Sequence, residues 1–136
     1  VYVGDRLGLI GLDLDSGEHK SRLNAPAVRG LTRGTRGLYV GAAGSVVAVS
    51  PGENRVRGEQ TATVGAAPAM DDGTVYAGTT GDNKGEAVGG VVALDAESGE
   101  PDWPTTLETS VRTDPAVTAD RVVVGTIGGD VIALER

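Results

Sequence analysis

Apolar residues in this chain come in short runs that are bounded by Gly, Pro, Asp and Ser. Two examples are Val91-Val92-Ala93-Leu94 and Arg121-Val122-Val123-Val124-Gly125. No longer window shows apolar residues at the spacing of an amphipathic helix, and β-branched runs of this kind are typical of strands. The runs are nearly continuous rather than alternating, which predicts strands that are covered on both faces.

The apolar runs recur in the same order along the chain, so the sequence contains an internal repeat. Three markers define it: a Tyr/Val-x-Gly strand, a second apolar strand and a small-Pro-Ala element. The first marker occurs at residues 2–4, 39–41, 76–78 and 123–125. The second occurs at residues 9–13, 46–49, 91–95 and 131–134. The third occurs at residues 25–28, 67–70 and 114–117.

The length of the repeat predicts its architecture. Successive Tyr/Val-x-Gly strands are 37, 37 and 47 residues apart, and ~37 residues accommodate four short strands with their turns. We predict a four-stranded antiparallel meander in each repeat. The repeats lie at residues 1–24, 25–65, 66–112 and 113–136. An insertion at residues 81–88 lengthens the third spacing, and we expect an exposed hairpin tip there, because insertions concentrate in surface loops.

Repeated antiparallel sheets with both faces covered predict an all-β fold, a partial β-propeller. We interpret residues 1–136 as a single propeller segment. It holds about three and a half blades, whereas closed propellers have ~4–8. The open ends then need a cover, either the missing blades of a longer propeller or self-association. A β-sandwich is the alternative, and the repeat argues against it.

The stretch from Ala93 to Trp103 is the most specific in the chain. Asp95 is placed to accept backbone N–H bonds in a turn, and Gly99 supplies the positive φ that such a turn needs at its end. Trp103 falls on the following strand, where its ring is large enough to wedge against an adjacent sheet.

This stretch resembles the pyrroloquinoline-quinone-like (PQQ-like) β-propeller repeat, whose signature is Ala-x-Asp-x-x-(Ser/Thr)-Gly-x-x-x-Trp. All its fixed positions are matched, at Ala93, Asp95, Ser98, Gly99 and Trp103. In that family the Trp docks between neighbouring blades, which implies a structural blade-docking role for these five residues. The resemblance is strong over residues 66–136 and looser before them. In the first repeat Ser21 stands where the Trp belongs, and the second repeat has lost both Asp and Trp.

Composition and charge exclude several classes of function. The chain has 22 Gly, one Trp and no Cys, and its formal net charge is −7. Disulfides, thiolate metal sites and Cys nucleophiles are therefore excluded. The lack of a basic stripe argues against a nucleic-acid partner, and no apolar run approaches the ~20 residues of a membrane span. The acidic surface with few Lys fits either a halophilic protein or a GC-rich genome.

The remaining candidate residues have simpler interpretations. His19 is the only histidine and lies among polar residues, so we expect a solvated edge residue and no zinc site. Residues 82–86 offer oxygen ligands but lack the spacing of a Ca²⁺ loop. The Gly pairs at 89–90 and 128–129 lie between strands, so they predict no phosphate-binding loop. An anion patch at Arg29, Arg33 and Arg36 is a weaker hypothesis than three solvated side chains.

The resemblance implies two classes of function. Quinoprotein dehydrogenases of this family hold PQQ and Ca²⁺ on the propeller axis, with a Cys–Cys disulfide and a Trp around the quinone. This chain has no Cys, and its Trp is at the docking position. Other members, an outer-membrane assembly lipoprotein and sensor domains of membrane kinases, work by binding.

We therefore expect a non-catalytic scaffold or binding module without catalytic, cofactor-binding or metal-ligating residues. Its ligand, a protein or a small molecule, is not identifiable from the sequence. Part of a PQQ-dependent dehydrogenase is the alternative. The resemblance also favours an exported protein, although the chain shows no signal peptide and begins at Val1, as a trimmed or incomplete sequence would.

Overall fold

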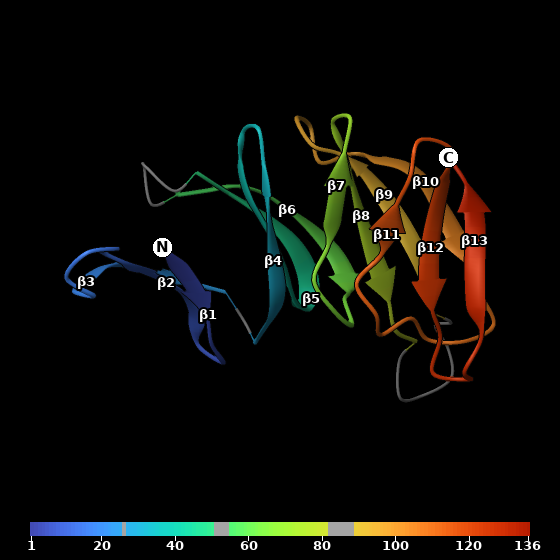
Figure 1. The fold of residues 1–136 in the computed structure, drawn as a ribbon, viewed down its shortest axis with the longest axis horizontal. Helices are drawn as coiled ribbons and strands as arrows, with labels where there is room; N and C mark the ends of the chain where they lie inside the picture. Colours follow the sequence, from blue (N-terminus) through green and yellow to red (C-terminus); the bar gives the residue numbers. More distant parts are fainter. Residues whose placement is uncertain (26, 51–54, 82–88) are drawn as a thin grey trace.

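The chain forms a row of four antiparallel sheets. The computed structural model describes residues 1–25, 27–50, 55–81 and 89–136, and these residues form strands and no helix. The sheets follow one another in sequence and lie side by side in space (Figure 1). We number them sheets 1 to 4 in chain order.

Each sheet is built from strands that are consecutive in the sequence. Sheet 1 contains β1 (Tyr2–Gly4), β2 (Gly8–Leu12) and β3 (His19–Asn24). Sheet 2 contains β4 (Val28–Gly34), β5 (Gly37–Ser50) and β6 (Arg55–Thr63). Sheet 3 contains β7 (Ala69–Asp71), β8 (Thr74–Thr79), β9 (Gly90–Asp95) and β10 (Pro101–Thr106). Sheet 4 contains β11 (Ala116–Val117), β12 (Arg121–Gly125) and β13 (Val131–Glu135).

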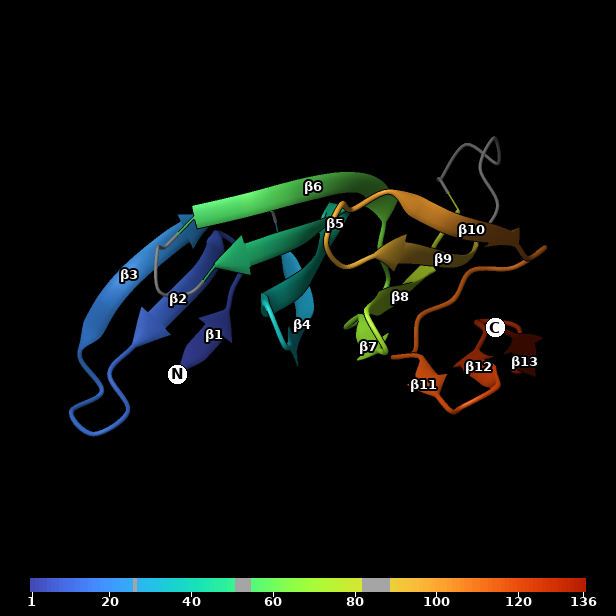
Figure 2. The same ribbon diagram turned by 90° about the horizontal axis from the view of Figure 1, so that it is seen from above.

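The predicted four-stranded meander is complete in sheet 3, where the strand order is β10-β9-β8-β7. In sheet 2 the two predicted central strands form one long element, β5, which bends back on itself (Figure 2). Gly44 has a φ of 105° in this bend. The first half of β5 pairs with β4 and the second half with β6. Because Ala43 and Gly44 also pair with β6, the ladder continues through the bend and no separate turn is formed.

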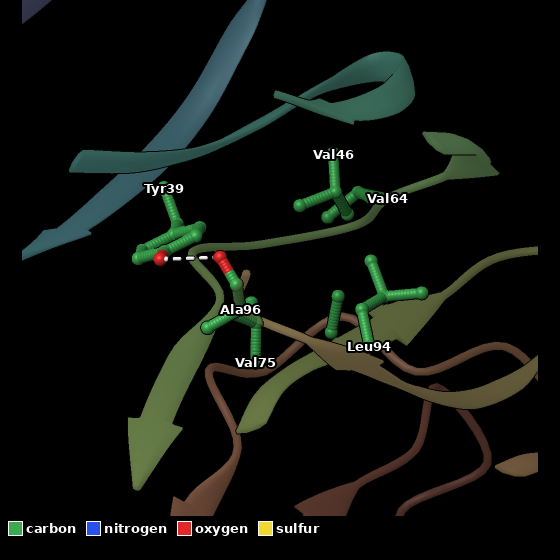
Figure 3. Packing of buried hydrophobic residues seen from close by; sticks show 7 residues of the cluster. Tyr39, Val46, Val64, Val75, Leu94 and Ala96 are labelled. Atoms are coloured by element: carbon green, nitrogen blue, oxygen red, sulfur yellow. Dashed lines mark hydrogen bonds between the residues drawn. The ribbon is translucent and has the colours of Figure 1, made fainter. Parts of the chain in front are cut away.

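Within the described residues, the core consists of three apolar clusters, one at each junction between sheets. At the junction of sheets 1 and 2 lie Leu9, Leu38, Val40, Val47 and Val49. At the junction of sheets 2 and 3 lie Tyr39, Val46, Val64, Val75, Ala77, Leu94 and Ala96 (Figure 3). At the junction of sheets 3 and 4 lie Tyr76, Val91, Ala93, Val111, Val122 and Val124.

Consecutive residues of β5 belong to different clusters, which explains the continuous apolar runs of the sequence. Val46 packs against sheet 3, whereas Val47 packs toward sheet 1. Adjacent side chains of a strand point to opposite faces, so a sheet with a neighbour on each side needs apolar residues at every position. The chain is therefore a partial, unclosed β-propeller, as predicted.

Some predicted features lie outside the described residues. They are Pro26 of the first small-Pro-Ala element and residues 82–88 of the insertion. The predicted hairpin tip in the insertion therefore stays a prediction.

Candidate functional site

The turn after β9 is organised by the Asp95 carboxylate. Its Oδ1 atom accepts hydrogen bonds from the backbone N–H of Glu97 at 3.0 Å, the backbone N–H of Ser98 at 2.7 Å and the Ser98 hydroxyl at 2.9 Å. Gly99 closes the turn with a φ of 76°, and its N–H donates to the Asp95 carbonyl at 2.8 Å. The left-handed backbone at this position favours Gly, because a side chain would strain it.

The turn after β2 repeats this geometry in sheet 1. The Oδ1 atom of Asp13 accepts from the backbone N–H of Asp15 at 3.0 Å, the backbone N–H of Ser16 at 2.9 Å and the Ser16 hydroxyl at 3.1 Å. Gly17 has a φ of 72°. The two copies therefore fold alike, although only one is followed by a Trp.

Hydrogen bonds to the two carboxylates favour their charged form. The backbone N–H of Ser98 is the main cause that lowers the pKa of Asp95. The Lys20 ammonium, whose Nζ lies 2.5 Å from Oδ2 of Asp13, is the main cause that lowers the pKa of Asp13 well below its usual value. Both groups are solvent-accessible, so these interactions shape turns rather than a buried reactive centre.

Trp103 lies on β10 at the junction of sheets 3 and 4. It is half-buried and packs against the cluster that contains Val122 and Val124 of β12. Its ring is 6.2 Å from the ring of Tyr76, centroid to centroid, with a tilt of 52°. Ala93 pairs directly with Trp103 across β9 and β10 and is fully buried. A docking role for the five motif residues remains a proposal. The contacts of Trp103 with the next sheet support it.

Two tyrosines of the repeat join neighbouring sheets, a role that the sequence analysis did not assign. The hydroxyl of Tyr39 in sheet 2 donates to the carbonyl of Ala96 in sheet 3 at 2.9 Å (Figure 3). The hydroxyl of Tyr76 in sheet 3 accepts from Nε of Arg136, beyond β13, at 2.9 Å. The recurrence of Tyr at a spacing of 37 residues is the signal that marks these positions.

The other candidate residues do not gather into a site. His19 is exposed at the start of β3, and Arg29, Arg33 and Arg36 are exposed around the β4–β5 hairpin. Arg36 pairs instead with Glu97 of sheet 3, at 2.7 Å between Nη1 and Oε1. Gly128 and Gly129 lie in the turn between β12 and β13.

Residues of metal-ligating type are scattered over the described part of the chain. Within residues 1–25, 27–50, 55–81 and 89–136, no three His, Cys, Asp or Glu side chains gather closely enough to hold a metal ion. These same ranges contain no helix able to cross a membrane.

Known proteins share this arrangement. A family model described as outer membrane protein assembly factor BamB matches residues 8–136. BamB from Moraxella catarrhalis superposes with a TM-score of 0.80 and 20% identity, over 99% of this chain and 42% of that chain. The computationally designed Ika4 protein superposes with a TM-score of 0.75 and 19% identity, over 98% of this chain and 83% of that chain.

A more distant likeness is to an enzyme. A europium-containing methanol dehydrogenase superposes with a TM-score of 0.63 and 19% identity, over 80% of this chain and 23% of that chain. No curated protein sequence matches the chain. The chain thus spans less than half the length of the BamB structure, and identities this low show the fold alone.

Proposed function

Because this chain belongs to the family of the outer membrane protein assembly factor BamB, we propose that it is a non-catalytic propeller scaffold that works by binding. The observation that carries this proposal is the open stack of sheets. Val46 and Val91 face the next sheet and are 3% and 2% exposed, whereas Val131, at the same place in sheet 4, is 78% exposed. An apolar face that is buried at each earlier junction is therefore uncovered at the last one.

The partner of this scaffold is proposed to be further sheets of the same kind. Val3 is exposed on β1 of sheet 1 and Val131 on β13 of sheet 4, and the turns that follow β1 and β12 expose Leu7 and Ile127. Exposed apolar patches at the ends of a stack favour association, and each existing junction shows the kind of surface that buries such a face. Other blades of a longer propeller, or a second copy of the chain, would both supply it.

The second candidate function is part of a quinone-dependent dehydrogenase. The likeness to a methanol dehydrogenase favours it. The residues of this chain do not fit such a cofactor site, because the sequence has no Cys to form the disulfide beside the quinone. The described residues also bring no three metal-ligating side chains together. The scaffold function therefore has the better support.

Cofactor uptake separates the two functions. The chain is incubated with PQQ and Ca²⁺, passed over a desalting column, and examined for quinone absorbance and dye-linked oxidation of primary alcohols. We expect no retained quinone and no oxidation, with an apo-quinoprotein dehydrogenase as the positive control. Stoichiometric retention of quinone together with alcohol oxidation would show that the dehydrogenase alternative is right.

A further inference from the structure

Strand register reveals which residue of sheet 2 corresponds to Trp103. In sheet 3, Trp103 pairs with Ala93 just after a bulge. In sheet 2, Gly58 pairs with Ala48 just after a bulge at the same place. Ala48 and Ala93 occupy the same position of the repeated Val-Val-Ala strand. Gly58 therefore stands where an indole ring would project toward sheet 3.

A recess lies between sheets 2 and 3 at this position. Its walls include Tyr39, Val46 and Ala48 of sheet 2, and Val75, Leu94 and Ala96 of sheet 3. The centre of a water-sized sphere can move within about 50 Å³ of the recess, and the empty space is about 420 Å³ when the part open to solvent is counted. A Cβ atom built on Gly58 meets no heavy atom within 4 Å. The recess is thus the place that Trp103 fills at the next junction, left open by the lack of a side chain.

Arg57 supplies an unused donor inside this recess. Its guanidinium carbon lies 5.8 Å from the centre of the Tyr39 ring, and Nη2 donates to the Tyr39 hydroxyl at 3.3 Å. Its Nε atom is buried without a hydrogen-bond partner. At the next junction, Tyr76 contacts both an arginine, Arg136 at 5.4 Å, and the indole of Trp103. At Tyr39 the arginine is present and the aromatic ring is missing.

We propose that the recess beside Gly58 binds a small molecule that carries a neutral, planar aromatic ring of indole size. The apolar walls would bury the ring, and the Arg57 guanidinium would lie against its π face, as arginine does in cation–π pairs. The carboxylates of Glu59, Asp95 and Glu97 also line the recess. They outnumber the guanidinium groups of Arg57 and of Arg36, which pairs with Glu97, so the surroundings carry a net negative charge that disfavours an aromatic acid. The site deepens the proposed binding function and rests on it.

Free indole is the probe for this site. We expect a saturable rise in the thermal midpoint of the wild type with indole, since a ligand that binds only the folded state stabilises it. Gly58→Trp should show a raised midpoint without indole and a binding constant weakened by about tenfold or more, because its own ring fills the space. Indole-3-acetate should bind more weakly than indole.

A variant on the opposite face of the same strand serves as the matched control. Thr61→Trp adds an indole on β6 at an exposed position outside the recess, and it should leave indole binding unchanged. Equal responses of the wild type and Gly58→Trp would overturn the site, because the probe would then bind elsewhere. If Gly58→Trp does not fold, Gly58→Leu, which fills the recess with fewer atoms, replaces it in the same comparison.

Two further outcomes keep this proposal distinct from others. Binding of a tryptophan-containing peptide without binding of free indole would overturn the small-molecule proposal in favour of a protein partner. Quinone uptake in the cofactor experiment would overturn the scaffold function and leave the indole result standing. If indole binding did not change on substitution of Gly58, the aromatic site would be overturned and the scaffold function would remain.

Discussion

Two turns of this molecule are each organised by the carboxylate of a single Asp. Asp13 and Asp95 each collect two backbone N–H groups and a serine hydroxyl within a turn of few residues. An Asp side chain is short enough to accept these bonds from its own turn, and a Gly at the end tolerates the left-handed backbone. The same solution appears in sheets 1 and 3 because both the Asp and the Gly are present.

These turns should make the stability of the protein depend on pH. The pKa values of Asp13 and Asp95 are lowered in the folded state, whereas an unfolded Asp titrates near ~3.9. The stabilisation is therefore complete above the unfolded value and is lost as the pH falls through the folded one. We expect the thermal midpoint to decrease when the pH is lowered below about 4. This decrease should be smaller in Asp95→Asn. Equal acid sensitivity of the two proteins in circular dichroism melts would contradict this.

The hydroxyl of Tyr39 should contribute measurably to the stability of the junction between sheets 2 and 3. Tyr39 is 2% exposed, and its hydroxyl donates to the Ala96 carbonyl. Tyr39→Phe removes that donor and also the acceptor of the Arg57 Nη2 bond, and it should lower the free energy of unfolding by about 1–2 kcal/mol in urea titrations. Tyr76→Phe is the comparison, because its hydroxyl accepts from a partly buried arginine. No change in Tyr39→Phe would show that water replaces the bond.

The strands determine how closely neighbouring sheets pack, in addition to pairing within their own sheet. The glycine that ends each Tyr/Val-x-Gly strand allows the next segment to come close. At Gly78, a Cβ atom would lie 2.4 Å from Cγ1 of Val111, which is fully buried. The repeat therefore encodes close packing between sheets, which explains why this glycine recurs without any turn to form.

Trp103 tests the docking role of the motif at the level of strands. Because the ring is half-buried against β12, Trp103→Ala should lower the free energy of unfolding by about 2–4 kcal/mol. It should also reduce hydrogen-exchange protection in β12 and β13, which a change confined to sheet 3 would leave intact. Trp103→Phe should retain most of both. A loss below ~1 kcal/mol with unchanged exchange in sheet 4 would refute the docking role.

At the scale of the whole molecule, the proposed scaffold function depends on what covers the outer faces of sheets 1 and 4. The three junctions bury apolar side chains, and along β5, β8 and β9 these side chains alternate between the two neighbouring junctions. The outer face of sheet 4 carries the same kind of residues without a neighbour. A stack with uncovered apolar ends is expected to recruit further sheets, which connects its architecture to the proposed scaffold function.

Association through the last sheet should be detectable in solution. We expect sedimentation velocity to show concentration-dependent assembly of the chain, weakened in Val131→Asp, because a charge on the outer face opposes burial. Val56→Asp is the matched control, since Val56 is an exposed apolar residue of β6. A chain that stays monomeric at all concentrations, or equal behaviour of both variants, would show that a second copy does not cover this face.

Much of the architecture could be predicted from sequence, because it depends on local rules. The number and order of sheets followed from the repeat. The turn at Asp95 followed from residue types at short spacing, and the covered faces followed from apolar residues at consecutive positions. The continuity of β5 was not predicted. It depends on the pairing of Ala43 with Thr63 and of Gly44 with Ala62, and these partners lie about 20 residues away, beyond the reach of local patterns.

The sequence by itself determined the repeat, the strands and the turns, since each is decided by neighbouring residues. Only the tertiary structure decided which faces meet. The equivalence of Gly58 and Trp103 is hidden in the sequence, because the second repeat has lost the Asp and Trp that mark the others. It emerges when a bulge sets the register of β6 against β5. The recess beside Arg57 exists because two sheets bring Tyr39 and Ala96 together from positions 57 residues apart, a contact that local patterns do not encode.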